Sequence, residues 1–278
     1  MLECVVNVSE GRDGELLDAL SAAAGGALLD RHADPDHHRA VFTLAGADVE
    51  EAARAVARVA VERIDLRRHS GVHPRLGVVD VVPFVPLDEH GAPVGPEGDL
   101  GDAIAARGRF GAWAAEVLGL PCIWYGPERS LPDVRRLAFV ELAPDVGPDT
   151  PHPTAGACAV GARPGLVAYN LWLDTADLPS ARTVAAAVRG PELRALGLAA
   201  GGATQVSCNL VDPFRFGPDR AYEAVARAAG EIGVAVVRAE LVGLAPRAVV
   251  EAVAPERRAL LDLSLERTVE ARLARLGA

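Results

Sequence analysis

Apolar residues along the 278-residue chain recur with the two spacings that are typical of β-strands and α-helices. Short apolar runs predict strands at residues 2–8, 27–30, 41–44, 77–82, 122–125, 158–163, 166–173, 193–198, 204–211 and 234–241. Helical spacing predicts helices at residues 49–64, 100–118, 180–189, 218–230 and 259–276, with others starting near Asp13 and at Pro246. We expect residues 88–98 and 126–136 to be irregular.

Strands and helices alternate twice along the chain, with a break near residue 165. This order is typical of two α/β units rather than one long parallel sheet. We therefore expect an α/β (α+β) fold with two sheet-plus-helix subdomains, residues 1–165 and 166–278. A proline-rich segment precedes the break, and its loop at residues 147–156 is either a rigid wall of a ligand groove or a plain connector.

A turn that contains His73, Pro74 and Arg75 leads directly into a valine-rich strand. Pro74 has a fixed φ and favours an extended backbone at His73. Pro83 and Pro86 cannot donate backbone hydrogen bonds, so we expect the strand to end there or to lie at a sheet edge. The turn is a candidate catalytic element, although on local pattern alone such a turn is more often ordinary loop structure.

Ionisable side chains gather in two clusters beside apolar strands. The first holds Asp34, Asp36, His37, His38 and Arg39, and the second holds His69, His73, Arg75 and Asp80. A buried carboxylate such as Asp80 needs a cation or donor, and Arg39, Arg75 and His73 are the candidates. If the strands are neighbours, the clusters meet and can bind an acidic ligand and move a proton. A metal site is the competing interpretation; the spacing matches no ligand template, so we expect none. Residues 34–38 alone are compatible with a solvated turn.

Composition narrows the function classes. The formal net charge is −10 and the pI about 5.2, which argues against a nucleic-acid partner. The chain contains no lysine, which excludes Schiff-base and phosphate-loop lysines. Its four cysteines are scattered, as expected of reduced, buried thiols. Neither a signal-peptide pattern nor a bilayer-spanning apolar run is present, so we expect a cytoplasmic protein without a membrane partner.

Several short motifs resemble, in order and over nearly the whole chain, the formiminotransferase domain of the formimidoyltransferase-cyclodeaminase family. They are Glu3-Cys4-Val5, Asn7, Ser9-Glu10-Gly11, Asp65-Leu66-Arg67-Arg68-His69, His73-Pro74-Arg75, residues 80–86, Pro144-Asp145, Gly147-Pro148, Gly161-Ala162-Arg163, Asn170, Gln205-Val206-Ser207, Asn209-Leu210, Asp212, Leu241-Val242-Gly243-Leu244 and Pro246. Each motif is weak alone, and together they are specific.

The resemblance implies two subdomains, ferredoxin-like in style, with a ligand groove between them, and a homodimer. It implies transfer of a formimino group from formimidoylglutamate, or a related amidine, to N5 of the co-substrate tetrahydrofolate, within histidine degradation and one-carbon metabolism. The family's catalytic histidine falls on His73. Its folate-contacting loop falls on Gly147, Pro148, Asp149, Thr150, His152, Pro153, Thr154 and Gly156.

Physical reasoning agrees with this assignment. A neutral imidazole can take the proton from an attacking amine and return it to the leaving amine. We expect His38, Arg39, Arg75 and Asp80 around the formimino donor. Arg39, Arg75 and Arg163 are the candidates to pair with the substrate carboxylates.

The chain departs from the family at four positions that would lie near ligands: Val72 replaces Glu, His38 replaces Asn, Pro151 replaces an apolar aromatic and Ala155 replaces Trp. These changes favour a second hypothesis, a folate-independent enzyme on the same scaffold that acts on another amidine or amide with water as acceptor. A third hypothesis is a non-catalytic ligand-binding protein, against which the intact turn at His73 argues.

Overall fold

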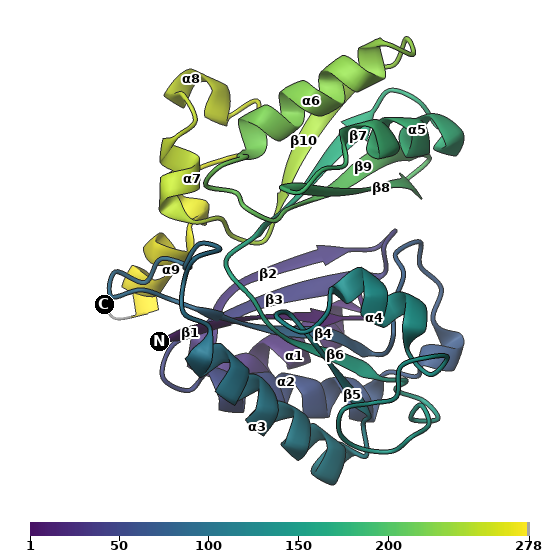
Figure 1. Ribbon diagram of the computed structural model, residues 1–278, viewed down its shortest axis with the longest axis vertical. Helices are drawn as coiled ribbons and strands as arrows, with labels where there is room; N and C mark the ends of the chain where they lie inside the picture. The colour runs from purple at the N-terminus through teal and green to yellow at the C-terminus, as the bar shows by residue number, and fades with distance from the viewer. Residues whose placement is uncertain (277–278) are drawn as a thin grey trace. The chain divides into compact units, whose positions relative to one another are not determined.

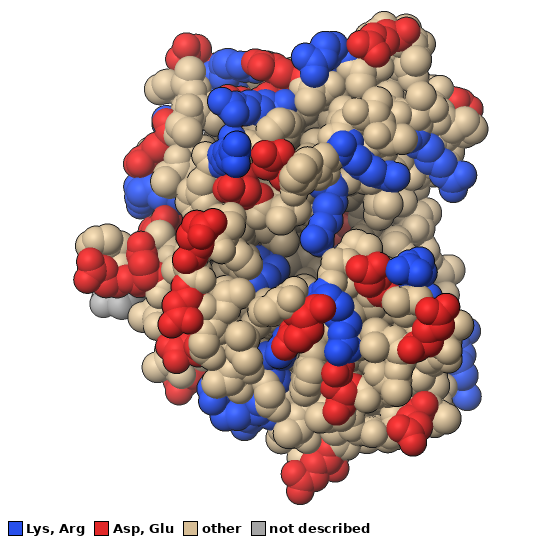
Figure 2. All heavy atoms as spheres, in the orientation of Figure 1, with Lys and Arg blue, Asp and Glu red and all other residues tan. Residues whose placement is uncertain are grey.

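The computed structural model describes residues 1–276, and the chain divides into unit 1, Met1–Pro164, and unit 2, Gly165–Ala278. Unit 1 contains a six-stranded sheet and unit 2 a four-stranded sheet (Figure 1). The expected α/β (α+β) fold with two sheet-plus-helix parts is confirmed. On the face of the molecule drawn in Figure 2, acidic and basic side chains are interspersed.

Unit 1 is built on a six-stranded sheet with strand order β2-β3-β1-β4-β6-β5. Its elements are β1 (Leu2–Val8), α1 (Gly14–Ala24), β2 (Leu28–Asp34), β3 (Arg39–Ala45), α2 (Val49–Arg63), β4 (Val79–Pro86), α3 (Gly101–Leu118), β5 (Cys122–Tyr125), α4 (Leu131–Leu137) and β6 (Cys158–Ala162), with short 3₁₀ turns at Gly25–Ala27 and Leu66–Arg68. The first six strand and helix elements form a β-α-β-β-α-β motif, which is ferredoxin-like. The last two strands extend the sheet by parallel pairing, β6 with both β4 and β5.

Unit 2 repeats the same motif in four antiparallel strands, with order β10-β7-β9-β8. Its elements are β7 (Val167–Leu173), α5 (Leu178–Val188), β8 (Leu193–Ala200), β9 (Ala203–Leu210), α6 (Pro218–Gly230), β10 (Val236–Val242), α7 (Arg247–Glu251), α8 (Pro255–Arg258), a 3₁₀ turn at Leu265–Arg267 and α9 (Val269–Leu276). Each unit therefore has a ferredoxin-like core.

Alternation along the strands decides which face of the unit 1 sheet is buried under helices. In β1, Leu2, Cys4, Val6 and Val8 belong to the core that also contains the buried residues of α1, α2 and α3. Helix α1 begins at Asp13, whose carboxylate accepts a 3.0 Å hydrogen bond from the backbone of Leu16. The other face of the sheet carries the polar group of Asn7, Arg39 and Asp80 beside a smaller apolar cluster, and it is the face on which the candidate site lies.

The expectation that β4 ends at its prolines is confirmed at Pro86 and wrong at Pro83, and the alternative of an edge strand is wrong. β4 passes through Pro83, ends at Pro86 and lies between β1 and β6. The pairs with β1 run from Leu2↔Pro86 to Cys4↔Phe84 and resume in the same register at Asn7↔Val81, so a gap in this ladder lies opposite Pro83, whereas the register itself shifts between Asn7 and Val8, beside Asp80. An interrupted ladder tolerates a residue without an N–H group.

The expectation of irregular structure at residues 126–136 is confirmed for residues 126–130 and wrong for residues 131–136, which belong to α4. The hydroxyl of Ser130 caps the helix by accepting from the backbone of Asp133 at 3.3 Å, and Pro132 lies in the first turn. Val134 anchors the helix with no exposed surface, in an apolar cluster with Val81 of β4 and Ile123 of β5.

The terminal helix expected at residues 259–276 covers only Val269–Leu276. Asp262 interrupts it with a φ of 52°, and its carboxylate accepts a 2.8 Å hydrogen bond from the backbone of Leu241. The preceding Leu261 is buried in the unit 2 core, so tertiary packing overrides the helical pattern there. No helix within residues 1–276 is both long enough and apolar enough to cross a membrane.

Candidate active site around His73

The topology of unit 1 brings three polar segments to one edge of its sheet. β1 is antiparallel to both of its neighbours, with Asn7 paired to Val41 of β3 and to Val81 of β4. The end of β1 therefore lies beside the starts of β3 and β4. These three positions carry Glu10, the first ionisable cluster and the second ionisable cluster. The clusters meet as expected, although their strands flank β1 rather than each other.

Asp80 is the buried centre of this edge, with a fully covered side chain. Its Oδ1 accepts from the backbone of Leu76 at 2.6 Å, and its Oδ2 accepts from Arg39 Nη1 at 2.5 Å and Arg135 Nη2 at 2.7 Å. Burial alone would raise the pKa of this carboxyl. The two guanidiniums and the backbone N–H group outweigh burial and lower it, so Asp80 is ionised.

Arg39 also fixes the end of β1, because its Nε and Nη2 donate to Asn7 Oδ1 at 3.1 and 2.8 Å. Of the three partners expected for Asp80, Arg39 forms the ion pair. Arg75 donates instead to His69 Nδ1, to the carbonyl of Gly71 at 3.0 Å and to the carbonyl of His73. Arg75 thus closes the turn on which His73 lies.

Gly71 allows this turn to pack tightly. A Cβ atom there would lie 2.4 Å from the carbonyl oxygen of His37 and 2.8 Å from the Cβ of His38. The two clusters therefore touch through a backbone that admits no side chain at this position.

The half-buried His73 ring is poised as a neutral base. Its Nδ1 lies 2.8 Å from the carbonyl oxygen of Pro74, which can only accept, so Nδ1 carries the proton and Nε2 keeps its lone pair. Burial lowers the pKa of the imidazole, and the nearby charges of Arg39 and Arg135 lower it further. The ring of His37 lies at a centroid distance of 5.7 Å.

His38 and His69 form a second pair of imidazoles at this edge. Their rings stack at 4.0 Å with an interplanar angle of 20°. His38 has a φ of 51°, and its ring nitrogens lie 3.1 Å from Glu10 Oε1 and 2.9 Å from the carbonyl of Ser70. The pKa of His69 is lowered to about 4, mainly by burial, so this ring is neutral at neutral pH.

The loop at residues 147–156 is joined to the strand that follows the His73 turn. Val78 donates to the carbonyl of Ala155 at 2.9 Å, and Gly77 forms a bridge with Gly156. His152 holds the loop with its own ring, because Nδ1 accepts from the backbone of Ala155 at 3.0 Å. Residues 147–151 are exposed, as a ligand-contacting loop requires.

Comparisons with known proteins place this geometry in a family. Residues 1–163 match the family model described as "Formiminotransferase domain, N-terminal subdomain". Glutamate formimidoyltransferase of Streptococcus pyogenes serotype M1 is 35% identical over 274 residues, which cover 88% of this chain and 89% of that protein. The chain belongs to the formiminotransferase family. The resemblance found in the sequence is thereby confirmed, and the chain is a transferase.

Two further relatives extend the comparison. Glutamate formimidoyltransferase of Thermoplasma acidophilum is 32% identical over 276 residues, 88% of each chain. Formimidoyltransferase-cyclodeaminase of Sus scrofa is 34% identical over 314 residues, which cover all of this chain and 56% of that protein. The chain thus spans nearly the full length of the two glutamate formimidoyltransferases and about half of the formimidoyltransferase-cyclodeaminase.

Arg163 lies apart from the other candidate residues. It follows β6, donates from its backbone to the carbonyl of Phe84 at 3.1 Å and from Nη1 to the carbonyl of Pro164 at 2.8 Å. Phe84 lies towards the end of β4, whereas Asp80 lies at its start. Sequence analysis missed Arg135, which the α4 helix supplies to Asp80. The capping signal of Ser130, Pro132 and Asp133 could have revealed the helix.

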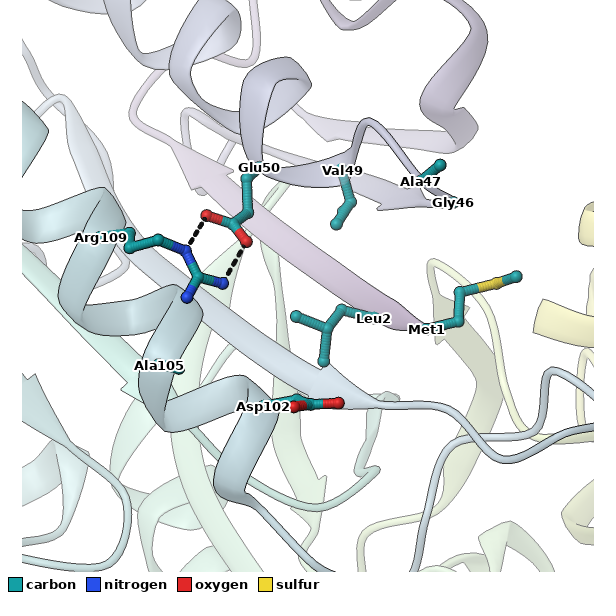
Figure 3. A pocket seen from close by; sticks show the side chains of 9 residues that line it. All are labelled: Met1, Leu2, Gly46, Ala47, Val49, Glu50, Asp102, Ala105 and Arg109. Carbon is teal, nitrogen blue, oxygen red and sulfur yellow. Dashed lines mark hydrogen bonds and ion pairs between the residues drawn. The ribbon is translucent and has the colours of Figure 1, made fainter.

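Within residues 1–276, no group of three or more His, Cys, Asp or Glu side chains is arranged to hold a metal ion. A cavity of about 450 Å³ opens elsewhere in unit 1, at the opposite end of β1 (Figure 3). Leu2 and Val49 line it, and the ion pair of Glu50 with Arg109, at 2.6 Å, forms part of its wall. It contains no imidazole, so the edge around His73 is the better candidate site.

Proposed function

We propose that this protein transfers a formimino group from formimidoylglutamate to N5 of tetrahydrofolate, with His73 as the general acid/base. The observation that carries the proposal is the state of the His73 ring. Its Nδ1 proton is engaged by Pro74, its Nε2 lone pair is available, and its pKa is lowered. Two relatives named glutamate formimidoyltransferase support the identity of the group transferred.

The chemistry matches a neutral imidazole. N5 of tetrahydrofolate attacks the formimino carbon and forms a tetrahedral intermediate, while His73 Nε2 accepts the proton from N5. The bond between that carbon and the glutamate nitrogen then breaks, and Nε2 returns the proton to the departing amine. No net proton is lost, and the products are glutamate and formiminotetrahydrofolate. A correctly placed base contributes roughly 10²- to 10⁴-fold to such a reaction.

The neighbouring residues suit different tasks in this proposal. Arg39, the residue that ties Asp80 to β1, also retains N–H groups that can receive a substrate carboxylate, with Arg163 and His38 as further contacts. Arg75 donates to two carbonyls of the His73 turn and to His69, so we assign it to holding His73 rather than binding a carboxylate. Asp80 holds Arg39 in place through its carboxylate. The loop at residues 147–156, exposed at residues 147–151, is proposed to hold folate, and the protein is proposed to act as a homodimer.

The test is a product assay with the full chain, formimidoylglutamate and tetrahydrofolate, in which glutamate and formiminotetrahydrofolate are measured by mass spectrometry. His73→Gln should lower the rate by roughly 10²- to 10⁴-fold. The matched control is His90→Gln, which changes an imidazole with 80% of its side chain exposed and should leave the rate unchanged. Full activity in the His73→Gln protein would contradict the proposed mechanism.

The folate-independent hypothesis has one observation in its favour. Ala155, where the family has tryptophan, is fully buried, so the loop lacks a flat apolar surface at that position for a pterin ring. Omitting tetrahydrofolate separates the two hypotheses. Glutamate release with water alone would favour hydrolysis, and a calorimetric titration with tetrahydrofolate would show whether the loop still binds folate.

A further inference from the structure

Helix α4 supplies a residue to the His73 edge, and the proposed function leaves its role open. It packs on the face of the sheet opposite α1–α3 (Figure 1), where Val134 joins Val81 and Ile123 in an apolar cluster. The next residue, Arg135, reaches from the helix to the buried Asp80.

Arg135 is connected to the His73 turn through one carboxylate. Its Nη2 donates to Asp80 Oδ2 at 2.7 Å, and Asp80 Oδ1 accepts from the backbone of Leu76 at 2.6 Å, three residues after His73. Arg39 holds the same Oδ2 but is itself bound to Asn7 on β1. The two arginines therefore hold Asp80 from two different elements, β3 and α4, and Asp80 holds the backbone N–H group of Leu76.

We propose that Arg135 is a positioning residue for His73, which acts through the Asp80 carboxylate. The inference rests on the proposed function and deepens it. Arg135 keeps the Leu76 end of the turn in place, so that Nε2 of His73 faces the reacting nitrogen. Its charge also reaches the His73 ring and, with that of Arg39, favours the neutral imidazole that a base requires.

The stability of α4 does not explain why position 135 carries an arginine. Val134 already anchors the helix with no exposed surface. The Arg135 side chain is only 18% exposed, and its Nε is buried without a hydrogen-bond partner. A buried guanidinium with an unpaired N–H group is costly, so anchoring of the helix does not by itself account for Arg135. Retention of the charge fits a role at the site.

The neighbouring Arg136 provides a matched control. It lies on the same helix, 66% exposed, and pairs with Asp133 at 2.9 Å. Arg135→Gln and Arg136→Gln remove the same charge from adjacent positions, but only the first removes a contact to Asp80. Arg135→Lys keeps the charge and loses the planar geometry of the guanidinium.

The primary measurement is an NMR titration of His73 and of the Leu76 amide, which needs no substrate. In Arg135→Gln, the pKa of His73 should rise towards its ordinary value and the Leu76 amide signal should move. In Arg136→Gln both should stay as in the wild type. If Arg135→Gln gives the same titration and the same Leu76 signal as Arg136→Gln, the inference is wrong, whatever the reaction proves to be.

Kinetics form the second measurement. Arg135→Gln should lower kcat on the order of 10²-fold, as for a misplaced reacting group, with a smaller change in KM. The acid limb of its pH–rate profile should move to higher pH. Arg135→Lys should keep the pKa of His73 low and still lose part of kcat. If Arg135→Gln does not fold, Arg135→Lys decides: wild-type kcat in that variant would overturn the positioning role.

Discussion

Replacing Asp80 by asparagine tests whether the buried carboxylate holds the edge of unit 1 together. The substitution keeps the shape of the side chain and removes its charge. Arg39 and Arg135, with side chains 11% and 18% exposed, would then lie near each other without a buried counter-charge. The amide nitrogen of asparagine would also face a donor, either the backbone N–H group of Leu76 or the two guanidiniums, because both oxygens of Asp80 accept hydrogen bonds. Loss of one partner from a buried ion pair costs about 3–5 kcal/mol.

The assay is urea unfolding followed by tryptophan fluorescence in a Trp172→Phe background, which leaves Trp113 and Trp124 as reporters of unit 1. The control is Asp18→Asn. Asp18 makes a 2.7 Å pair with Arg31 but is 75% exposed, so its loss should cost only about 0.2–1 kcal/mol. Equal losses from the two variants, at unchanged m-values, would refute the reasoning.

The same variant has a predicted pH signature. The pKa of Asp80 is lower in the folded protein than in the unfolded chain, so the folded state binds fewer protons on the acid side. The stability contributed by Asp80 is therefore complete above the unfolded pKa of about 3.9 and is lost as the pH falls through the folded pKa. Asp80→Asn should flatten this part of the stability curve.

Two further predictions concern the same edge. Gly77→Ala places a Cβ atom 2.2 Å from the backbone oxygen of Ala157 and should cost about 1–3 kcal/mol in unfolding free energy, whereas Gly108→Ala, in open space on α3, should not destabilise. Because the pKa of His69 falls to about 4 on folding, stability should decline as the pH drops below about 6.5. In acid unfolding titrations, the unfolding free energy should decline less in His69→Gln than in the wild type, whereas His90→Gln should decline as the wild type does. A decline in His69→Gln equal to that of the wild type would exclude His69 as the cause.

The meeting of the two ionisable clusters was predictable because apolar runs mark the strands and polar residues mark their ends. Each cluster directly adjoins a strand, so any sheet that pairs the strands with a common neighbour brings the clusters together. Asp80 was identified for the same reason, as a charge inside an apolar run. Its choice of Arg39 over Arg75 was not predictable, since both lie within reach in sequence terms. The turn geometry at Gly71 decides it, because it directs Arg75 to carbonyls of its own loop.

Contacts between distant elements were the part that the sequence did not reveal. Arg135 lies 55 residues from Asp80, on a seven-residue helix that is too short for apolar periodicity to reveal and whose clearest signal is the Ser130 cap. Likewise, Pro83 indicates an edge strand by local rules, but a second neighbour, β6, makes β4 central. In both cases a tertiary contact outweighs the local preference.

The two units have the same ferredoxin-like arrangement, each around its own hydrophobic core. The difference between their connections explains where the candidate site lies. In unit 2 the hairpin between β8 and β9 is closed by Gly201 and Gly202, and α6 reaches β10 through residues 231–235. In unit 1 the equivalent hairpin carries residues 35–38, and α2 reaches β4 through residues 64–78. These longer connections hold His37, His38, His69, His73 and Arg75. The ferredoxin-like core fixes the ends of β1, β3 and β4 side by side, and loops inserted at that edge can then carry a site that the core alone does not specify. Exchanging the core residues of the two units would therefore affect stability, whereas shortening residues 64–78 to the length found in unit 2 would remove the proposed base and its supports together.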